Sequence, residues 1–128
     1  MGHFAQIAKQ ETTMCRLFVN RTKLKTEEVI NRELTIVDFD FAPNIDDAGK
    51  IEYDQQTGEV STHGVIVFAE MPDKFYHVGS IFTKICRSWM TGFDSAEEAG
   101  RALQAEGGVR VRFFPQPGRR YTNVEILG

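Results

Sequence analysis

The order of the segments in which apolar and polar residues alternate constrains the fold more than any other feature. Alternation with a period of two predicts five strands, and a helical pattern separates the third strand from the fourth. The predicted strands cover residues 33–42, 62–70, 74–78, 109–114 and 120–127. The sequence therefore predicts a mainly β chain in which three strands, a helical insert and two further strands follow one another.

The helical insert contains two amphipathic segments with recognisable starts. Ser80 is a candidate N-cap, and the apolar residues that follow it fall on one helix face: Ile81, Phe82, Ile85, Cys86 and Trp89. Ser95 and Glu98 form a capping-box pattern, which predicts a second helix that ends near residue 106. Before the insert, Asp54 and Gly58 predict the turn of an extra hairpin over residues 50–60.

The chain has 128 residues, which suits one domain with its own core. Its element order is that of an OB-fold, a five-stranded Greek-key barrel that binds oligonucleotides or oligosaccharides. We predict a five-stranded OB-fold-like barrel with a helical insert between its strands 3 and 4 and an extra hairpin after its strand 1. Other small barrels with one helix remain an alternative. We assign residues 25–128 to this single domain and residues 1–24 to an N-terminal extension, flexible in part.

The net charge of −3 comes from 15 basic and 18 acidic residues, and at first it argues against a nucleic-acid binder. The distribution of the charges along the chain changes this interpretation. Residues 1–32 hold six basic and three acidic residues, residues 33–106 hold five and fourteen, and residues 107–128 hold four and one. The three segments carry +3, −9 and +3, so a basic surface can form locally from the two ends of the chain.

The predicted hairpin at the end of the chain brings cations and aromatic rings together. Arg110, Arg112 and Phe114 share one face of their strand, and Tyr121 faces outward on the next strand. Guanidinium groups bind phosphates and aromatic rings stack on unpaired bases, a combination that suits single-stranded nucleic acid. An ordinary solvated strand face shows the same alternation of Val and Arg, so this alternative stays open.

Further candidate residues lie elsewhere in the chain. Arg119 and Arg120 lie in the turn of the last hairpin, where they could clamp a phosphate or simply be solvated. On the short third strand we expect Tyr76 near the ligand, next to Lys74, and Phe75 in the core. The remaining candidates are supporting cations near the N-terminus: Arg21, Lys23 and Lys25.

Three segments of the chain together resemble a known family. They are residues 27–41 (EEVINRELTIVDFDF), residues 65–70 (VIVFAE), and residues 75–80 (FYHVGS) leading into residues 81–85 (IFTKI). Their pattern is similar to the small OB-fold single-stranded DNA-binding proteins of phages and conjugative plasmids, over roughly residues 25–127. This resemblance implies a sequence-tolerant binder of single-stranded DNA, and of RNA as an open alternative, in replication, recombination or transfer. It also implies a homo-oligomer or a cooperative filament on DNA.

The acidic insert, and the absence of a long acidic C-terminal tail, depart from the housekeeping single-strand binders. This departure puts recruitment of partner proteins by such a tail in doubt. The acidic middle also supports a different function, that of a protein-interaction or inhibitory module whose acidic surface imitates nucleic acid. That function accounts for the acidic segment but leaves the arginine-rich hairpin unexplained.

Enzymatic function has weaker support in the sequence. Asp38 and Asp40 lie two residues apart on one strand face, and paired carboxylates can hold a divalent metal in a nuclease. A solvated strand face explains them more simply, and no phosphate-binding glycine loop or cysteine–histidine zinc motif occurs in the sequence. We therefore expect a protein that is not an enzyme and has no cofactor and no metal.

The two cysteines, Cys15 and Cys86, have no close spacing partner. Two free thiols in a reducing cytoplasm are the simpler interpretation, with a single disulfide as the alternative. No apolar run approaches the roughly 18 residues that a membrane span needs. We therefore expect a cytoplasmic protein that has no membrane partner.

Overall fold

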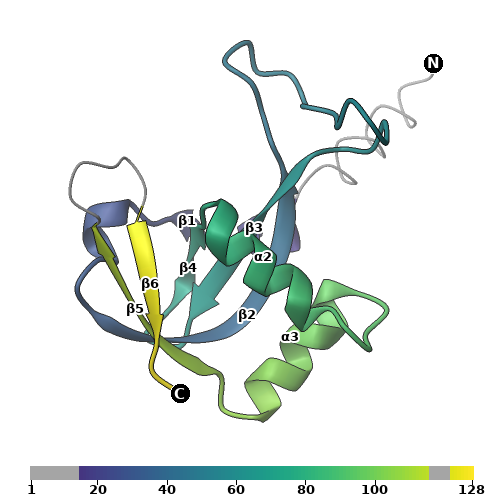
Figure 1. Ribbon diagram of the computed structural model, residues 1–128. Helices are drawn as coiled ribbons and strands as arrows, with labels where there is room; N and C mark the ends of the chain where they lie inside the picture. Colours follow the sequence, from purple (N-terminus) through teal and green to yellow (C-terminus); the bar gives the residue numbers. More distant parts are fainter. Residues whose placement is uncertain (1–14, 116–121) are drawn as a thin grey trace.

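The computed structural model describes residues 15–115 and 122–128, which form one mixed sheet with two α-helices (Figure 1). Its strands, in the order in which they lie side by side, are β1 (Thr22–Lys23), β4 (Met71–His77), β3 (Thr62–Phe68), β2 (Glu33–Pro43), β5 (Val109–Pro115) and β6 (Thr122–Ile126). All neighbours are antiparallel except β1, which runs parallel to β4. The predicted mainly β class, with helices between the third and fourth long strands, is confirmed.

The predicted closure into a five-stranded barrel is not confirmed, because the described sheet has six strands and stays open. Strands β1 and β6 lie at its two edges. The outer edge of β4 is paired with residues 22–24 instead of β6, and the Leu24 N–H donates to the Phe75 carbonyl at 2.8 Å. Downstream, the Asn31 N–H donates to the Phe113 carbonyl of β5 at 2.6 Å. Residues 22–31 therefore run from β4 to β5 and supply the pairing that a closing strand would make.

Helices α2 (Ser80–Trp89) and α3 (Ala96–Ala105) contribute to the larger of two hydrophobic cores. Gly79 is the N-cap of α2, so the prediction of Ser80 was wrong by one residue, whereas the Ser95 cap is confirmed by its acceptance of the Glu98 N–H at 3.2 Å. Helix α2 lies close to β3 because Gly64 has no side chain: a Cβ there would lie 3.1 Å from the Cys86 sulfur of α2.

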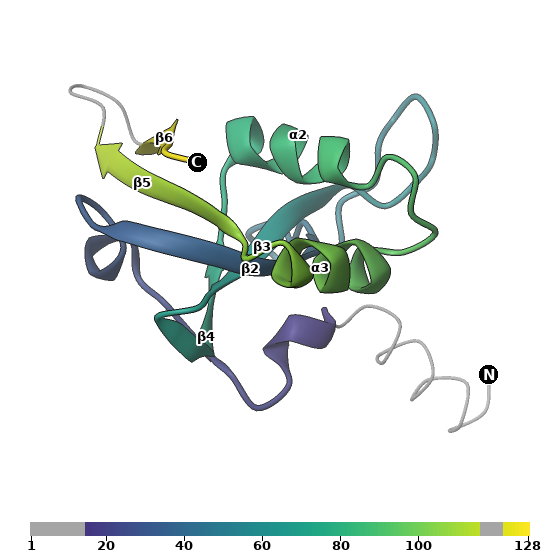
Figure 2. The same ribbon diagram turned by 90° about the horizontal axis from the view of Figure 1, so that it is seen from below.

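A second, smaller core covers the opposite face of β2, β3 and β4. The 3-10 turn η1 (Arg16–Phe18) lies on that face, and Figure 2 shows it across the sheet from α2. The core consists of Cys15, Leu17, Ala42, Val65, Val67 and Phe75. Residues 15–24, which the sequence analysis placed in an N-terminal extension, are therefore packed against the sheet. As a result, the central strands are buried on both faces.

The two cysteines lie in different cores, Cys15 in the smaller and Cys86 in the larger, and both are free thiols. Burial raises the pKa of Cys15 to about 11 and that of Cys86 to about 12. Both thiols are therefore protonated and poorly reactive at neutral pH. None of the helices in the described part of the chain is long and apolar enough to span a membrane.

Residues 44–61, between β2 and β3, form an arm that projects from the end of the sheet (Figure 1). Two isolated bridges, Ile45 with Ile51 and Tyr53 with Val60, hold its strands together. The predicted turn is confirmed, because the Asp54 carboxylate accepts the N–H groups of residues 56 and 57 and Gly58 has a φ of +74°. The arm is thus an ordered extension of the predicted hairpin.

The packing of η1 generates a test of stability. Leu17 is 0% exposed, so we expect Leu17→Ala to lower the free energy of unfolding by about 2–5 kcal/mol. Val19 lies two residues further on and is 57% exposed, so Val19→Ala should change it by no more than about 0.5 kcal/mol. Urea unfolding of both variants measures the difference. Equal and small effects would show that residues 15–19 are not part of the cooperative fold.

Candidate nucleic-acid interface

The outward face of β5 carries three of the predicted binding residues. Arg110, Arg112 and Phe114 alternate with Val111 and Phe113, which are buried in the larger core. The two arginines are exposed and Phe114 is half-buried. We call Arg110, Arg112 and Phe114 the β5 face. The alternation in the sequence therefore predicts the orientation of these side chains correctly.

Carboxylates on the neighbouring strands neutralise the β5 face. Arg110 Nη2 lies 2.6 Å from Glu33 Oε2 of β2, and Arg112 Nη2 lies 3.5 Å from Glu125 Oε2 of β6. The guanidinium of Arg112 also lies over the Phe114 ring, 5.8 Å from its centroid. These ion pairs are exposed, and such pairs are worth only about 0–1 kcal/mol. A phosphate could therefore replace either carboxylate at small cost.

The other predicted residues do not gather on this face. Lys23 and Lys74 lie on β1 and β4 at the opposite end of the strand order, where the Lys74 ammonium donates to the Thr22 hydroxyl at 3.1 Å. Lys25 is exposed at the start of the 3-10 turn η2 (Thr26–Glu28), and Arg21 donates to the Pro72 carbonyl. Arg119, Arg120 and Tyr121 lie outside the described residues.

The prediction that Tyr76 faces the ligand while Phe75 faces the core is wrong for Tyr76. Tyr76 is 5% exposed and lies in the larger core, with its ring centroid 5.6 Å from that of Phe113. Phe75 is buried in the smaller core on the other face of β4. Alternation assigns these two rings to opposite faces, but η1 covers the face that would otherwise be solvated. Tyr76 therefore has a structural role, and Phe75 belongs to the smaller core.

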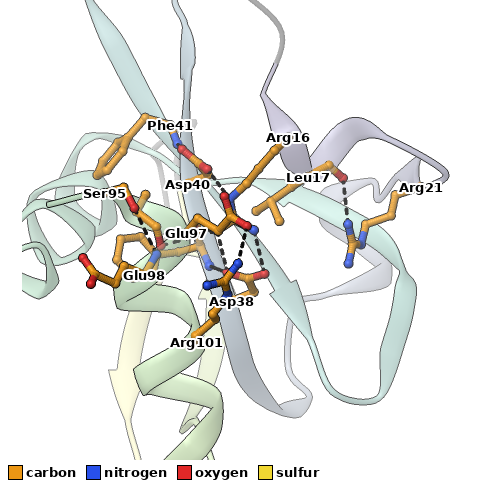
Figure 3. A network of polar contacts seen from close by, with 12 residues as sticks. Arg16, Leu17, Arg21, Asp38, Asp40, Phe41, Ser95, Glu97, Glu98 and Arg101 are labelled. Atoms are coloured by element: carbon orange, nitrogen blue, oxygen red, sulfur yellow. Dashed lines mark hydrogen bonds and ion pairs between the residues drawn. The ribbon is translucent and has the colours of Figure 1, made fainter. Parts of the chain in front are cut away.

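Asp38 and Asp40, the carboxylates of the nuclease alternative, bind an arginine from the N-terminal segment (Figure 3). Arg16 donates from Nη1 and Nη2 to the two Asp38 oxygens at 3.0 and 2.8 Å. Its Nε lies 2.6 Å from Asp40 Oδ2, an ion pair whose angle falls outside hydrogen-bond geometry. The guanidinium also donates to the Phe39 and Ala96 carbonyls.

This cluster joins η1, β2 and the start of α3, and all three of its charged side chains are at most 30% exposed. Gly100 allows α3 to lie close to Asp38 of β2, because a Cβ at this position would overlap the Asp38 carboxylate. An ammonium or guanidinium satisfies paired carboxylates in the same way that a divalent cation would. The two aspartates therefore have a structural partner, which argues against the nuclease hypothesis.

A groove lies at the base of the arm, and sequence reasoning missed it. Its volume is about 690 Å³, within the range of roughly 300–1,000 Å³ that is typical of ligand pockets. Its lining comes from η1, β1, the ends of β2, β3 and β4, and the arm. The side chains used below are Phe18, Lys23, Ile45, Ile51, Phe75, His63 and His77. We call this site the groove.

Two histidines in the groove are hydrogen-bonded to each other. His63 Nε2 lies 2.6 Å from His77 Nδ1, and His63 Nδ1 lies 2.7 Å from the side-chain oxygen of Asn44. Burial, together with His63 and Lys23, lowers the pKa of His77 to about 4, and burial followed by Lys23 also lowers that of His63. Both rings are therefore neutral at pH 7. In the antiparallel pairing of β3 and β4, His77 lies opposite Val65, so His63 is two positions further along β3 on the same face of the sheet.

The Arg16 cluster predicts a large cost of substitution. Arg16→Met would leave two half-buried carboxylates facing each other, so we expect a loss of about 2–3 kcal/mol in the free energy of unfolding. Arg101→Met removes an exposed ion pair with Glu97 and should cost about 0.5 kcal/mol or less. Adding Asp38→Asn and Asp40→Asn to Arg16→Met should recover part of the loss. If urea unfolding shows that the triple variant is no more stable than Arg16→Met, the electrostatic explanation is wrong.

The histidine pair predicts a dependence of stability on pH. The pKa of His77 is lower in the folded state, about 4, than in the unfolded state, about 6.5, so the unfolded state binds more protons between these pH values. Stability should therefore fall as the pH drops from about 6.5 to about 4, with a contribution from His77 of roughly 1–3 kcal/mol. In His77→Gln this part of the pH dependence should disappear, as measured by urea unfolding across the range. If the free energy of unfolding depends on pH in the same way in His77→Gln and in the unmodified protein, His77 does not cause the loss of stability.

Comparisons with protein-family models, with curated proteins and with solved structures find no match to this chain. The residues and their geometry are therefore what point to a function. Two sites emerge from that geometry: the β5 face, which the sequence predicts, and the groove, which only the structure reveals.

Proposed function

We propose that this protein binds single-stranded DNA with little sequence preference, and that the β5 face carries the contacts, together with the candidate residues of segment 116–121, which lies outside the described residues. The observation that carries this proposal is the contact between the exposed Arg112 guanidinium and the half-buried Phe114 ring, with Arg110 on the same face of the strand. A cation and a ring side by side offer a phosphate contact and a stacking surface to one nucleotide. The loop sequence adds Arg119, Arg120 and Tyr121.

The strand order supports the finer proposal that the five long strands form an open OB-fold. In that fold the loop between strands 1 and 2 and the loop between strands 4 and 5 contact the ligand. Here the arm occupies the first of these places in the chain, and residues 116–121 occupy the second. The resemblance to the binders of phages and conjugative plasmids extends the proposal to replication, recombination or transfer of a mobile element in the cytoplasm.

Binding on the β5 face would work by exchange of ion-pair partners. In the absence of DNA each arginine lies beside one carboxylate, Arg110 beside Glu33 and Arg112 beside Glu125. A phosphate then displaces a carboxylate from each guanidinium, and an unpaired base stacks on the Phe114 ring. The carboxylates compete with DNA, so they set the affinity and its dependence on salt.

A second candidate function, protein interaction through the arm, has its own observation. Ile45, Tyr53 and Val60 are 55%, 60% and 41% exposed, although the arm is ordered by internal hydrogen bonds. The arm also holds five acidic residues and one lysine. Exposed apolar side chains with acidic neighbours are typical of protein-docking surfaces. If this were the main function, the protein would fold normally and bind no oligonucleotide.

The test of the proposed function is fluorescence anisotropy with labelled oligo-dT of about 20 nucleotides, longer than the roughly 4–16 nucleotides that one OB-fold covers. We expect binding that weakens between about 50 and 200 mM salt. Replacing both arginines, Arg110→Ala with Arg112→Ala, should weaken binding at least about 10-fold and reduce the slope against log salt by about 1.4. The matched control is Arg101→Ala, which removes an exposed arginine from an ion pair on α3 and should change neither quantity.

Removing the competing carboxylates is the sharper test. Glu33→Gln with Glu125→Gln frees both arginines without shortening any side chain, so affinity for oligo-dT should rise about 3- to 10-fold. If the protein binds no oligo-dT at low salt, the β5 face does not bind DNA. The same conclusion follows if neither double substitution changes the affinity. Circular dichroism of each variant confirms that the fold is intact.

A further inference from the structure

A chain of hydrogen bonds in the groove assigns the protons on both histidine rings. The Asn44 amide nitrogen donates to the Ser61 hydroxyl at 2.8 Å, and the amide oxygen faces His63 Nδ1 at 2.7 Å. Because a carbonyl oxygen can only accept, the proton of neutral His63 lies on Nδ1. His63 Nε2 is then an acceptor, and it receives the Nδ1 proton of His77. His77 Nε2 therefore has no proton, and among the described residues it has no hydrogen-bond partner.

The surroundings of His77 Nε2 are aromatic on the sheet side. The ring centroids of Phe18 and Phe75 are 4.5 Å apart, and those of Phe18 and His77 are 5.6 Å apart. The Phe75 and His77 rings meet edge to face at 5.4 Å. The arm contributes aliphatic side chains, Ile45 and Ile51, to the same groove. A flat ring placed here would contact aromatic and aliphatic carbon and find one hydrogen-bond acceptor.

The charge of the groove favours an anion. Lys23 is the charged side chain among the described residues that line it, and both histidines are neutral. The acidic residues of the arm do not line the groove, and two of them, Asp46 and Asp54, are occupied by the N–H groups of their own turns. The groove thus offers an aromatic wall, an acceptor nitrogen and one cation.

We propose that the groove binds a single nucleotide, whose base packs against the Phe18 and Phe75 rings, whose base N–H donates to His77 Nε2, and whose phosphate pairs with Lys23. The inference rests on the proposed function insofar as a bound DNA strand supplies the nucleotide, but a free mononucleotide has the same chemistry. A tryptophan or tyrosine side chain of a partner protein, like a nucleotide base, has a flat ring and a hydrogen-bond donor. It brings no anion for Lys23, so the nucleotide fits the groove better.

The experiment is an NMR titration of the full chain with thymidine monophosphate, followed by N3-methylthymidine monophosphate. The methyl group removes the one ring N–H of thymine and leaves the sugar and the phosphate unchanged. We expect the first ligand to shift the signals of His63, His77, Ile45 and Ile51. The methylated ligand should bind about 5- to 10-fold more weakly, the loss expected for one hydrogen bond. The histidine nitrogen signals should also show both rings protonated at Nδ1.

Variants test the two polar contacts separately. His77→Phe keeps a ring but loses the acceptor, so it should bind both ligands equally and weakly. Lys23→Ala should weaken binding of the nucleotide but not of thymidine, which has no phosphate. Lys50→Ala is the matched control, since Lys50 is an exposed lysine of the arm that does not line the groove. Because the methylated ligand tests the acceptor in the unmodified protein, a variant that fails to fold does not remove the test.

The outcomes separate this inference from the proposed function. If oligo-dT binds but thymidine monophosphate shifts no signal of the groove, or if both monophosphates bind equally, the inference is overturned and the proposed function stands. If the monophosphate binds and oligo-dT does not, the groove takes a free nucleotide and the proposed function fails. Groove signals shifted by oligo-dT as well identify the strand as the source. Binding of N-acetyltryptophanamide in preference to the nucleotide would assign the groove to a partner protein and overturn the inference.

Discussion

The burial of the central strands on both faces depends on one cluster of charges. Arg16 comes from the N-terminal segment, and its guanidinium lies between Asp38 and Asp40 of β2 while it also reaches the first carbonyl of α3. Ion pairs that are largely removed from water are costly to break, because each unpaired charge stays poorly solvated. The cluster therefore holds η1 against β2, and η1 in turn covers the face of β3 and β4 that would otherwise be exposed.

This cover determines where a ligand can bind. Because residues 15–24 occupy one face of β3 and β4 and the helices occupy the other, Tyr76 is buried in the larger core and cannot stack on a base, while Phe75 meets a ligand only where it lines the groove. Two candidate nucleotide sites in the described part of the chain lie outside this cover: the β5 face toward one end of the sheet order, and the groove between η1 and the arm toward the other. They differ in chemistry. The first consists of exposed arginines beside a ring, and the second of enclosed rings beside a neutral histidine.

The net charge of −3 describes neither surface. On the β5 face two arginines meet two glutamates, so the described residues there are locally neutral although the C-terminal segment is basic. At the groove the acidic arm is close in space, yet its aspartates bond the backbone of their own turns and only Lys23 lines the pocket with a charge. Electrostatic attraction of a nucleic acid is therefore decided by the pairing of individual side chains rather than by totals along the chain.

Periodicity and turn chemistry in the sequence determined the elements: the order of strands and helices, the outward direction of Arg110 and Arg112, the Ser95 cap and the Asp54 turn. Each of these depends on residues within a few positions of one another, where spacing specifies geometry. The tertiary structure alone decided the burial of Tyr76, the pairing of Arg16 with Asp38, the contact between His63 and His77, and the open edge of the sheet. These features join residues 14 or more positions apart, or depend on what covers a strand face. Alternation tells which side chains share a face, but only packing decides whether that face meets water, a helix or the N-terminal segment.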